Sequence, residues 1–247
     1  MKREYITLHS RPLAKEMHVL AYGEKGIPLL IFPTQDSLCT NMEDFGMIQT
    51  MQDWIDDGIF QVYVADSNDR ESWSDTQGDP AWRARRQESY YQFIVDEVLP
   101  FIQKRNTSGR LPIVSGFSMG GTHAAIVFLR RPELFSGLFA VSGVYNSDYF
   151  FGSWMDSTLY NNTPTEFIRH MPPDHPYIQV YNQKRMVFCV GQGAWEEDGI
   201  RTMKDLEGSM KRLGIHAWFD YWGYDVNHDW PWWKKMVRYH LPKFLES

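Results

Sequence analysis

The stretch that most constrains the fold of this chain covers residues 111–131, where two apolar runs flank a glycine-rich turn. Residues 111–114 read Leu-Pro-Ile-Val and follow the turn-prone Thr-Ser-Gly of 107–109, a pattern that predicts a short buried strand. Residues 122–129 are rich in alanine and aliphatic side chains and predict a buried helix. Between them, residues 116–121 read Gly-Phe-Ser-Met-Gly-Gly, so the chain must reverse from strand to helix within a few residues.

Such a tight reversal predicts a special role for its central serine. The turn strains its central residue and needs missing side chains on either side, which Gly116 and Gly120 supply. It lifts the Ser118 hydroxyl clear of the sheet, with the Met119 backbone N–H directed at the same space. The alternative is an ordinary glycine-rich turn with an incidental serine. We favour a nucleophile elbow, because strand, turn and helix all fall where that motif requires them.

Composition and charge narrow the class of protein. The chain has 247 residues, 43% of them hydrophobic, which is long enough for one large domain, 1–247, with a substantial core. A net charge of -6 without a basic run gives no support for binding nucleic acid or an anionic membrane. The N-terminus lacks an apolar signal core and no segment approaches transmembrane length, so we expect a cytoplasmic protein. Cys39 and Cys189 lack metal-ligand spacing, and Cys189 lies in an apolar run typical of a buried thiol.

The order of apolar runs predicts an α/β fold, in which a mostly parallel central sheet carries helices on both faces. The first two strands are expected to form an antiparallel hairpin at the sheet edge. Residues 145–184, rich in Tyr, Phe, Asn and Pro, break the rhythm, and we interpret them as an insertion over the carboxyl edge, a lid or pocket wall. Strands are expected at 3–9, 16–22, 27–32, 60–65, 111–114, 138–141, 185–190 and 217–222, and helices at 41–57, 81–105 with an interruption near Pro100, 122–129, 198–213 and 231–245.

A serine hydroxyl needs a base to take its proton, and in a G-x-S-x-G hydrolase the chain order is Ser, acid, His. Only His216, His228 and His240 lie late enough in the chain. His216 opens a predicted strand and His240 lies in the last predicted helix, positions typical of surface or packing residues. His228 lies in the loop leaving the last strand, on the edge expected to carry Ser118, and is therefore the candidate base.

The acid is expected in the loop after the preceding strand, which contains Glu196, Glu197 and Asp198. We expect Asp198 to cap the following helix and Glu197 to lie at its start, both common structural roles for acids. Glu196 lies nearer the strand end and is the preferred acid, with Glu197 as the alternative. A second oxyanion donor, besides the N–H of Met119, is expected in the loop after strand 27–32, where Gln35 is the first candidate and Thr34 the next.

Three motifs resemble the putative-esterase family of α/β-hydrolases. They are the elbow at 116–121, the later Asn-His-Asp-Trp-Pro-Trp-Trp at 227–233, and Tyr-Tyr at 90–91 followed by Asp-Glu-Val-Leu-Pro at 96–100. This family includes esterase D, feruloyl and acetyl esterases and mycolyltransferases, and the resemblance spans about residues 28–244. Its members usually have Gly-Thr-x-Asp where residues 193–196 read Gly-Ala-Trp-Glu, which implies Glu196 as the acid, whereas alignment from the downstream helix implies Glu197. They often have His-Gly where this chain has Pro33 and Thr34.

The residues and the resemblance together predict a serine carboxylic ester hydrolase that works through an acyl-enzyme, without metal or cofactor, on a small-molecule or carbohydrate-linked ester. Acyl transfer or thioester hydrolysis would use the same Ser118, Glu196 and His228. A catalytically silent binding module for carbohydrate or a protein partner is the alternative from another class. Seven of the tryptophans would suit it: Trp73, Trp82, Trp154, Trp195, Trp230, Trp232 and Trp233. Labelling by an organophosphonate probe separates an active esterase from such a module.

Overall fold

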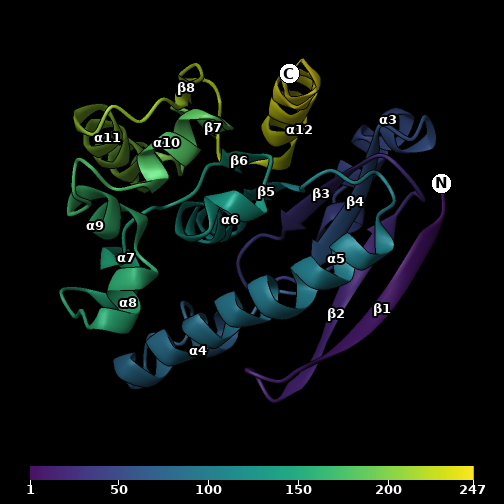
Figure 1. The fold of residues 1–247 in the computed structure, drawn as a ribbon. Helices are drawn as coiled ribbons and strands as arrows, with labels where there is room; N and C mark the ends of the chain where they lie inside the picture. The colour runs from purple at the N-terminus through teal and green to yellow at the C-terminus, as the bar shows by residue number, and fades with distance from the viewer. Residues whose placement is uncertain (247) are drawn as a thin grey trace.

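The computed structural model describes residues 1–246, which build one eight-stranded sheet in the order β1-β2-β4-β3-β5-β6-β7-β8 (Figure 1). β1 and β2 form an antiparallel hairpin, and β2 pairs antiparallel with β4. All the remaining pairs are parallel. The strands are β1 (Arg3–Ser10), β2 (Lys15–Tyr22), β3 (Ile27–Phe32), β4 (Phe60–Ala65), β5 (Ile113–Phe117), β6 (Gly137–Val141), β7 (Arg185–Val190) and β8 (Trp218–Tyr221).

Two hydrophobic cores, one on each face, hold helices against this sheet. Every residue of β3, β4, β5 and β6 is buried, as expected for strands covered on both sides. Alternate residues supply the two cores: Leu30 and Phe32 face one core, whereas Leu29 and Ile31 face the other. The first face carries α4 (Pro80–Phe93), α5 (Leu99–Arg105), α6 (Met119–Arg130) and α11 (Glu197–Arg212), and the second carries α1 (Asn41–Asp44), α2 (Met47–Thr50), α3 (Gln52–Asp56), α12 (Trp230–His240) and a final 3-10 turn at Leu241–Leu245.

The predicted α/β architecture with a mostly parallel sheet is confirmed, and the expected strands appear with shifts of a few residues at some ends. The strand expected at 111–114 begins later, at Ile113, and runs on to Phe117, because the elbow residues Gly116 and Phe117 still pair with β6. None of the helices within residues 1–246 combines the length and apolar character needed to cross a bilayer.

Two predicted helices differ in the structure. The helix expected at 41–57 is three short helices, because Gly46 adopts a left-handed φ of 73° and ends the first turn. The interruption expected near Pro100 is a π-helical turn at Ile94–Val98, and the chain remains helical from Pro80 to Arg105 (Figure 1). The altered hydrogen-bond pattern of a π turn accommodates the missing N–H of the proline.

Residues 145–184 contain four short helices that the sequence pattern did not reveal. These are α7 (Asp148–Phe151), α8 (Ser157–Asn161), α9 (Pro164–Arg169) and α10 (Tyr177–Asn182). Their length of four to six residues leaves too few turns for an amphipathic period to appear in the sequence. α9 packs against α11, and α7 reaches the edge of the sheet at which β5, β6 and β7 end.

Candidate active site

The turn from β5 into α6 has the strained geometry expected of a nucleophile elbow. Ser118 has φ 56° and ψ -124°, a conformation that non-glycine residues rarely adopt and that costs roughly 1–3 kcal/mol. A Cβ on Gly116 would lie 2.1 Å from the carbonyl oxygen of Gly120. A Cβ on Gly120 would lie 2.3 Å from the carbonyl oxygen of Phe32 at the end of β3. The two glycines thus allow the helix to start directly against the neighbouring strand.

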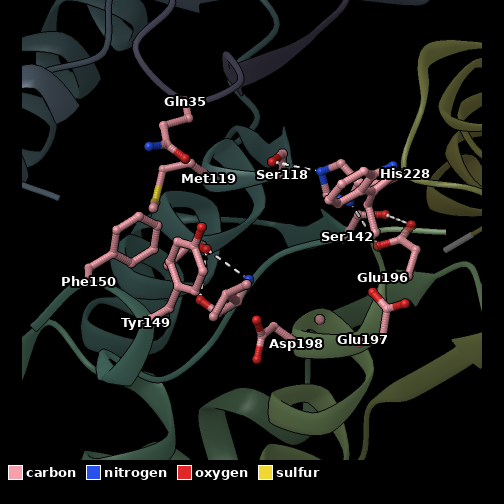
Figure 2. Close-up of a pocket in the computed structure, with 14 residues that line it drawn as sticks. Gln35, Ser118, Met119, Ser142, Tyr149, Phe150, Glu196, Glu197, Asp198 and His228 are labelled. Carbon is pink, nitrogen blue, oxygen red and sulfur yellow. Dashed lines mark hydrogen bonds and ion pairs between the residues drawn. The ribbon is translucent and has the colours of Figure 1, made fainter. Parts of the chain in front are cut away.

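Three side chains that are distant in the sequence meet at the carboxyl edge of the sheet (Figure 2). Ser118 Oγ lies 2.9 Å from His228 Nε2, and His228 Nδ1 lies 2.9 Å from Glu196 Oε2. Since the carboxylate can only accept, Nδ1 carries a proton and donates it to Glu196, which leaves Nε2 of the neutral ring free to accept from Ser118. The structure therefore brings together the three residues expected as nucleophile, base and acid.

The chain topology explains this meeting. Ser118 follows β5, Glu196 follows β7, and His228 lies between β8 and α12. Parallel strands put all three loops on one edge, where ligands bind in open α/β sheets. The His228 N–H also donates to the carbonyl of Ala194, over 3.0 Å, which ties the histidine loop to the loop that carries Glu196.

Glu196 is a buried carboxylate with a full set of partners. Its residue is 1% exposed, and Oε1 accepts from the hydroxyl of Ser142 at 2.7 Å and from the N–H of Gly191 at 3.3 Å. Ser142 Oγ in turn accepts from the indole N–H of Trp233 at 3.1 Å. Sequence reasoning did not find Ser142 or Trp233. The only signal in the sequence is that Ser142 follows the strand β6 directly, before Gly143; its positive φ of 50° appears only in the structure.

The other carboxylates near Glu196 and His228 face solvent or have other partners. Glu197 is the first residue of α11 and is exposed. Asp198 was expected to cap this helix, which is wrong: the cap position is Glu196, and Asp198 forms an ion pair with Arg201 at 2.9 Å. Asp229 next to the histidine caps α12 by accepting from the N–H of Trp230. Figure 2 shows Glu197 and Asp198 apart from the hydrogen-bonded Ser118–His228–Glu196 chain.

Two backbone N–H groups remain available beside Ser118. Within residues 1–246, neither the N–H of Met119 nor that of Gln35 donates to a protein acceptor, and both residues line the pocket around Ser118. The N–H of Thr34, the other candidate, is used by Asn41 Oδ1 at 3.1 Å. Gln35 lies in the loop after β3, and Met119 begins α6, shortly after the end of β5. Because β3 and β5 are neighbours in the sheet, the two N–H groups lie beyond adjacent strand ends.

The pocket above these groups has a volume of about 390 Å³. Tyr149 and Phe150 of α7 form part of its wall, so the 145–184 segment contributes to it (Figure 2). Trp195 lies at its rim, 84% exposed, with a left-handed φ of 69°. An aromatic side chain held in water at a pocket rim offers a face for a ligand.

Comparison with protein families identifies the group to which the chain belongs. The model of the family described as "Putative esterase" matches residues 10–244, nearly the whole chain. The chain belongs to this family. The protein is accordingly an esterase, an enzyme that hydrolyses esters, which confirms the resemblance drawn from the sequence motifs. A comparison with curated protein sequences found no match.

Solved structures with the same fold include several esterases. A ferulic acid esterase is 17% identical, with a TM-score of 0.75 and coverage of 99% of this chain and 98% of its own. An S-formylglutathione hydrolase from Agrobacterium tumefaciens is 16% identical, with a TM-score of 0.73 and coverage of 99% and 94%. MPT51 (FbpC1) from Mycobacterium tuberculosis is 11% identical, with a TM-score of 0.73 and coverage of 100% and 99%. The likeness extends over the full length and establishes the α/β-hydrolase fold of the esterase.

In the described part of the esterase, one group of three side chains lies close enough together to bind a metal ion. The ligand atoms of Cys189, Asp220 and His240 lie within 4.8 Å of one another, on the sheet face covered by α12. Burial raises the pKa of the Cys189 thiol well above its usual value and lowers the pKa of His240 to about 4, so both are neutral near pH 7. None of the three lines the pocket around Ser118. Cys39 and Cys189 are both buried free thiols.

Proposed function

We propose that the protein is a serine carboxylic ester hydrolase in which Ser118, His228 and Glu196 form a catalytic triad and hydrolysis proceeds through an acyl-enzyme. The observation that supports it is the continuous hydrogen-bond chain from Ser118 Oγ through His228 to Glu196, at 2.9 Å for each step. Ser118 opens onto the pocket, while the Glu196 side chain is fully buried and that of His228 is 23% exposed. This burial gradient suits a nucleophile that meets substrate and an acid that meets only the base.

In the first half of the reaction, Ser118 Oγ attacks the ester carbonyl carbon and its proton passes to His228 Nε2. The tetrahedral oxyanion accepts hydrogen bonds from the N–H groups of Met119 and Gln35. Such preorganised donors stabilise the charge that develops in the transition state by about 3–4 kcal/mol each. The carbon–oxygen bond to the alcohol then breaks, and His228 returns the proton to the leaving alkoxide oxygen.

In the second half, water loses a proton to His228 Nε2 and attacks the acyl carbon. A second oxyanion forms between the same two donors. Its collapse breaks the bond to Ser118, which recovers its proton from His228, and the carboxylic acid leaves. Throughout, Glu196 keeps the proton of the neutral ring on Nδ1 and stabilises the imidazolium when it forms.

We further propose a compact small-molecule or carbohydrate-linked ester as substrate. The pocket of about 390 Å³ is near the lower end of the roughly 300–1,000 Å³ typical of ligand sites. Its wall from Tyr149 and Phe150 and the exposed ring of Trp195 suit an aromatic or sugar ring next to the ester. A panel of p-nitrophenyl esters with increasing acyl length would define the acyl limit, and added alcohols would measure acyl transfer in competition with hydrolysis.

Labelling with a fluorophosphonate probe tests the nucleophile directly. The wild type should be modified at one serine, Ser118→Ala should not be modified, and Ser153→Ala, which removes an exposed serine in the 145–184 segment, should label like the wild type. A burst of p-nitrophenol from p-nitrophenyl acetate, stoichiometric with enzyme, is expected from the acyl-enzyme. If Ser118→Ala kept more than about a thousandth of the wild-type kcat, the nucleophile would have to be another residue.

A further inference from the structure

A buried carboxylate–imidazole pair, Asp69 and His123, takes no part in the mechanism above. Asp69 begins the short 3-10 helix Asp69–Glu71 that follows β4, and His123 lies on α6. Their exposed fractions are 0% and 1%, and His123 Nε2 lies 2.7 Å from Asp69 Oδ1. Neither residue lines the pocket. A carboxylate buried this deeply needs a hydrogen bond to each of its oxygens. His123 satisfies Oδ1, so the partner of Oδ2 shows what else the pair holds in place.

That second oxygen holds the loop that supplies an oxyanion donor. Asp69 Oδ2 accepts from the backbone N–H of Asp36 at 3.1 Å. Asp36 has a left-handed φ of 59°, which costs an L-residue about 1–2 kcal/mol and persists only where the surroundings hold it. The contact with Asp69 is therefore a direct restraint on the peptide that follows Gln35.

A second path connects the same residue to the Gln35 side chain. The carbonyl oxygen of Asp69 accepts from the N–H of Ser74 at 2.9 Å, and Ser74 Oγ accepts from Gln35 Nε2 at 2.8 Å. On the other side of the loop, the N–H of Thr34 is held by Asn41 Oδ1. The N–H groups before and after Gln35 are thus both fixed, and the Gln35 N–H between them has no protein acceptor within residues 1–246.

The other member of the pair, His123, belongs to the helix whose first residue is Met119. His123 lies four residues after Met119 on α6, and positions i and i+4 share one side of a helix. The ring packs against Tyr90 at 5.0 Å between centroids and against Phe32, at the end of β3, at 5.9 Å. The contacts from Asp36 through Asp69 to His123 therefore link the loop of Gln35 to the helix that presents Met119.

We propose that Asp69 and His123 are positioning residues that set the separation and direction of the two oxyanion donors at Met119 and Gln35. This inference rests on the proposed function, because it concerns the hole in which that reaction stabilises its oxyanion. A backbone donor stabilises the transition state only if it is in place before the charge develops. A flexible loop would lose that benefit, and a displacement of about 1 Å can cost on the order of 100-fold in rate.

Asp69→Asn tests the proposal, with Asp66→Asn as a matched control. Asp66 is also buried, three residues earlier, and it contacts His18 Nδ1 at 2.8 Å and the N–H of Cys39 at 2.8 Å. Asp66 thus holds the loop after β3 at Cys39, further along the chain from Gln35 than Asp36 is. We expect Asp69→Asn to lower kcat for p-nitrophenyl acetate by about 10- to 100-fold with KM within about twofold, since only transition-state binding is lost. Asp66→Asn should change kcat by less than about threefold at a similar loss of Tm.

Variants of His123 provide a second test that does not depend on the folding of Asp69→Asn. His123→Gln keeps an N–H donor toward Asp69 and should retain most of the wild-type kcat, whereas His123→Phe lacks the donor and should lose about tenfold or more. A wild-type kcat in Asp69→Asn and His123→Phe would overturn the proposal, as would an equal loss in Asp66→Asn. Either outcome for the Asp69 and His123 variants leaves the proposed function intact. That function fails only if Ser118→Ala remains active or is still modified by the fluorophosphonate probe.

Discussion

The hydroxyl of Ser142 donates to Glu196 Oε1 over 2.7 Å and joins the end of β6 to the start of α11. Through this bond, the carboxylate that contacts His228 is connected to Trp233 of α12, whose indole N–H donates to Ser142 Oγ. The ring of Trp233 also packs edge-on against His228, with centroids 4.9 Å apart. Ser142 and Trp233 thus orient both the acid and the base, although Ser118 itself hydrogen-bonds through its hydroxyl to His228.

Ser142→Ala should therefore impair the reaction while leaving the fold intact. The change leaves Glu196 Oε1 with only the 3.3 Å contact to Gly191 and leaves the Trp233 N–H without its acceptor. An unsatisfied buried polar group costs about 1–3 kcal/mol, so the free energy of unfolding should fall by that amount. We expect kcat to drop about tenfold, from looser orientation of the imidazole. Denaturant unfolding and p-nitrophenyl acetate kinetics would check both, and an unchanged kcat would contradict the orienting role.

Glutamine substitutions should distinguish the roles of the neighbouring residues Glu196 and Glu197. Glu196→Gln places an amide opposite His228 Nδ1, which no longer favours the tautomer that accepts the Ser118 proton, and kcat should fall by about 10³–10⁴-fold. Glu197→Gln removes an exposed charge in the first turn of α11, worth about 0.3–1 kcal/mol of stability, and should be nearly silent in kcat. Steady-state kinetics of both proteins is the measurement. A silent Glu196→Gln beside a crippled Glu197→Gln would move the acid one residue along.

Alanine substitutions of two helical glycines should have opposite effects. A Cβ on Gly120 would lie 2.3 and 2.4 Å from the carbonyl oxygens of Phe32 and Pro33, so Gly120→Ala forces α6 away from β3. We expect a loss of about 1–3 kcal/mol or more in the free energy of unfolding, together with lower activity. Gly208 of α11 has open space around it, and Gly208→Ala should stabilise the protein by up to about 1 kcal/mol. A fully stable, active Gly120→Ala protein would rule out the close approach.

His240 should make the fold sensitive to acid. Burial lowers its pKa to about 4, with Lys243 adding to the effect and Asp220 opposing it. The neighbouring Cys189 thiol is neutral, because burial raises its pKa. The unfolded state, with an ordinary pKa of about 6.5, binds the proton more readily. Stability from this site is therefore present above about pH 6.5 and is lost as the pH falls toward about 4.

His240→Phe removes this titration and keeps an aromatic ring beside Phe139 and Trp218. Its free energy of unfolding should change less between about pH 7 and pH 4.5 than that of the wild type. The exposed His216, changed to Gln, should leave the wild-type pH dependence intact. Equal pH dependence in wild type and His240→Phe would show that the proton binds elsewhere.

Local sequence patterns predicted much of the fold, because each depends on neighbours in the chain. Runs such as Ile27–Phe32 and Arg185–Val190 identify buried strands by composition alone, and their bounds agree with the structure. The short helices of residues 145–184 were missed, since four to six residues carry no readable period. The broken helix after Asn41 was also missed. A single glycine does not reveal its φ until packing selects the left-handed conformation at Gly46.

The sequence by itself determined the elbow at Ser118, because a strained turn needs glycines at fixed spacing, and it determined which strand-end loops carry His228 and Glu196. Only the tertiary structure decided which acid reaches the imidazole and which N–H groups stay free. Glu196 and Glu197 are neighbours in the sequence, but their burial in the fold is opposite. Glu196 is buried and accepts from Ser142, whereas Glu197 is exposed to solvent. Likewise, Asp69 and Asp36 are 33 residues apart, and their hydrogen bond exists only because β3 and β4 pair in parallel and end at the same edge. Contacts of that kind depend on the register of distant strands, which no local pattern encodes.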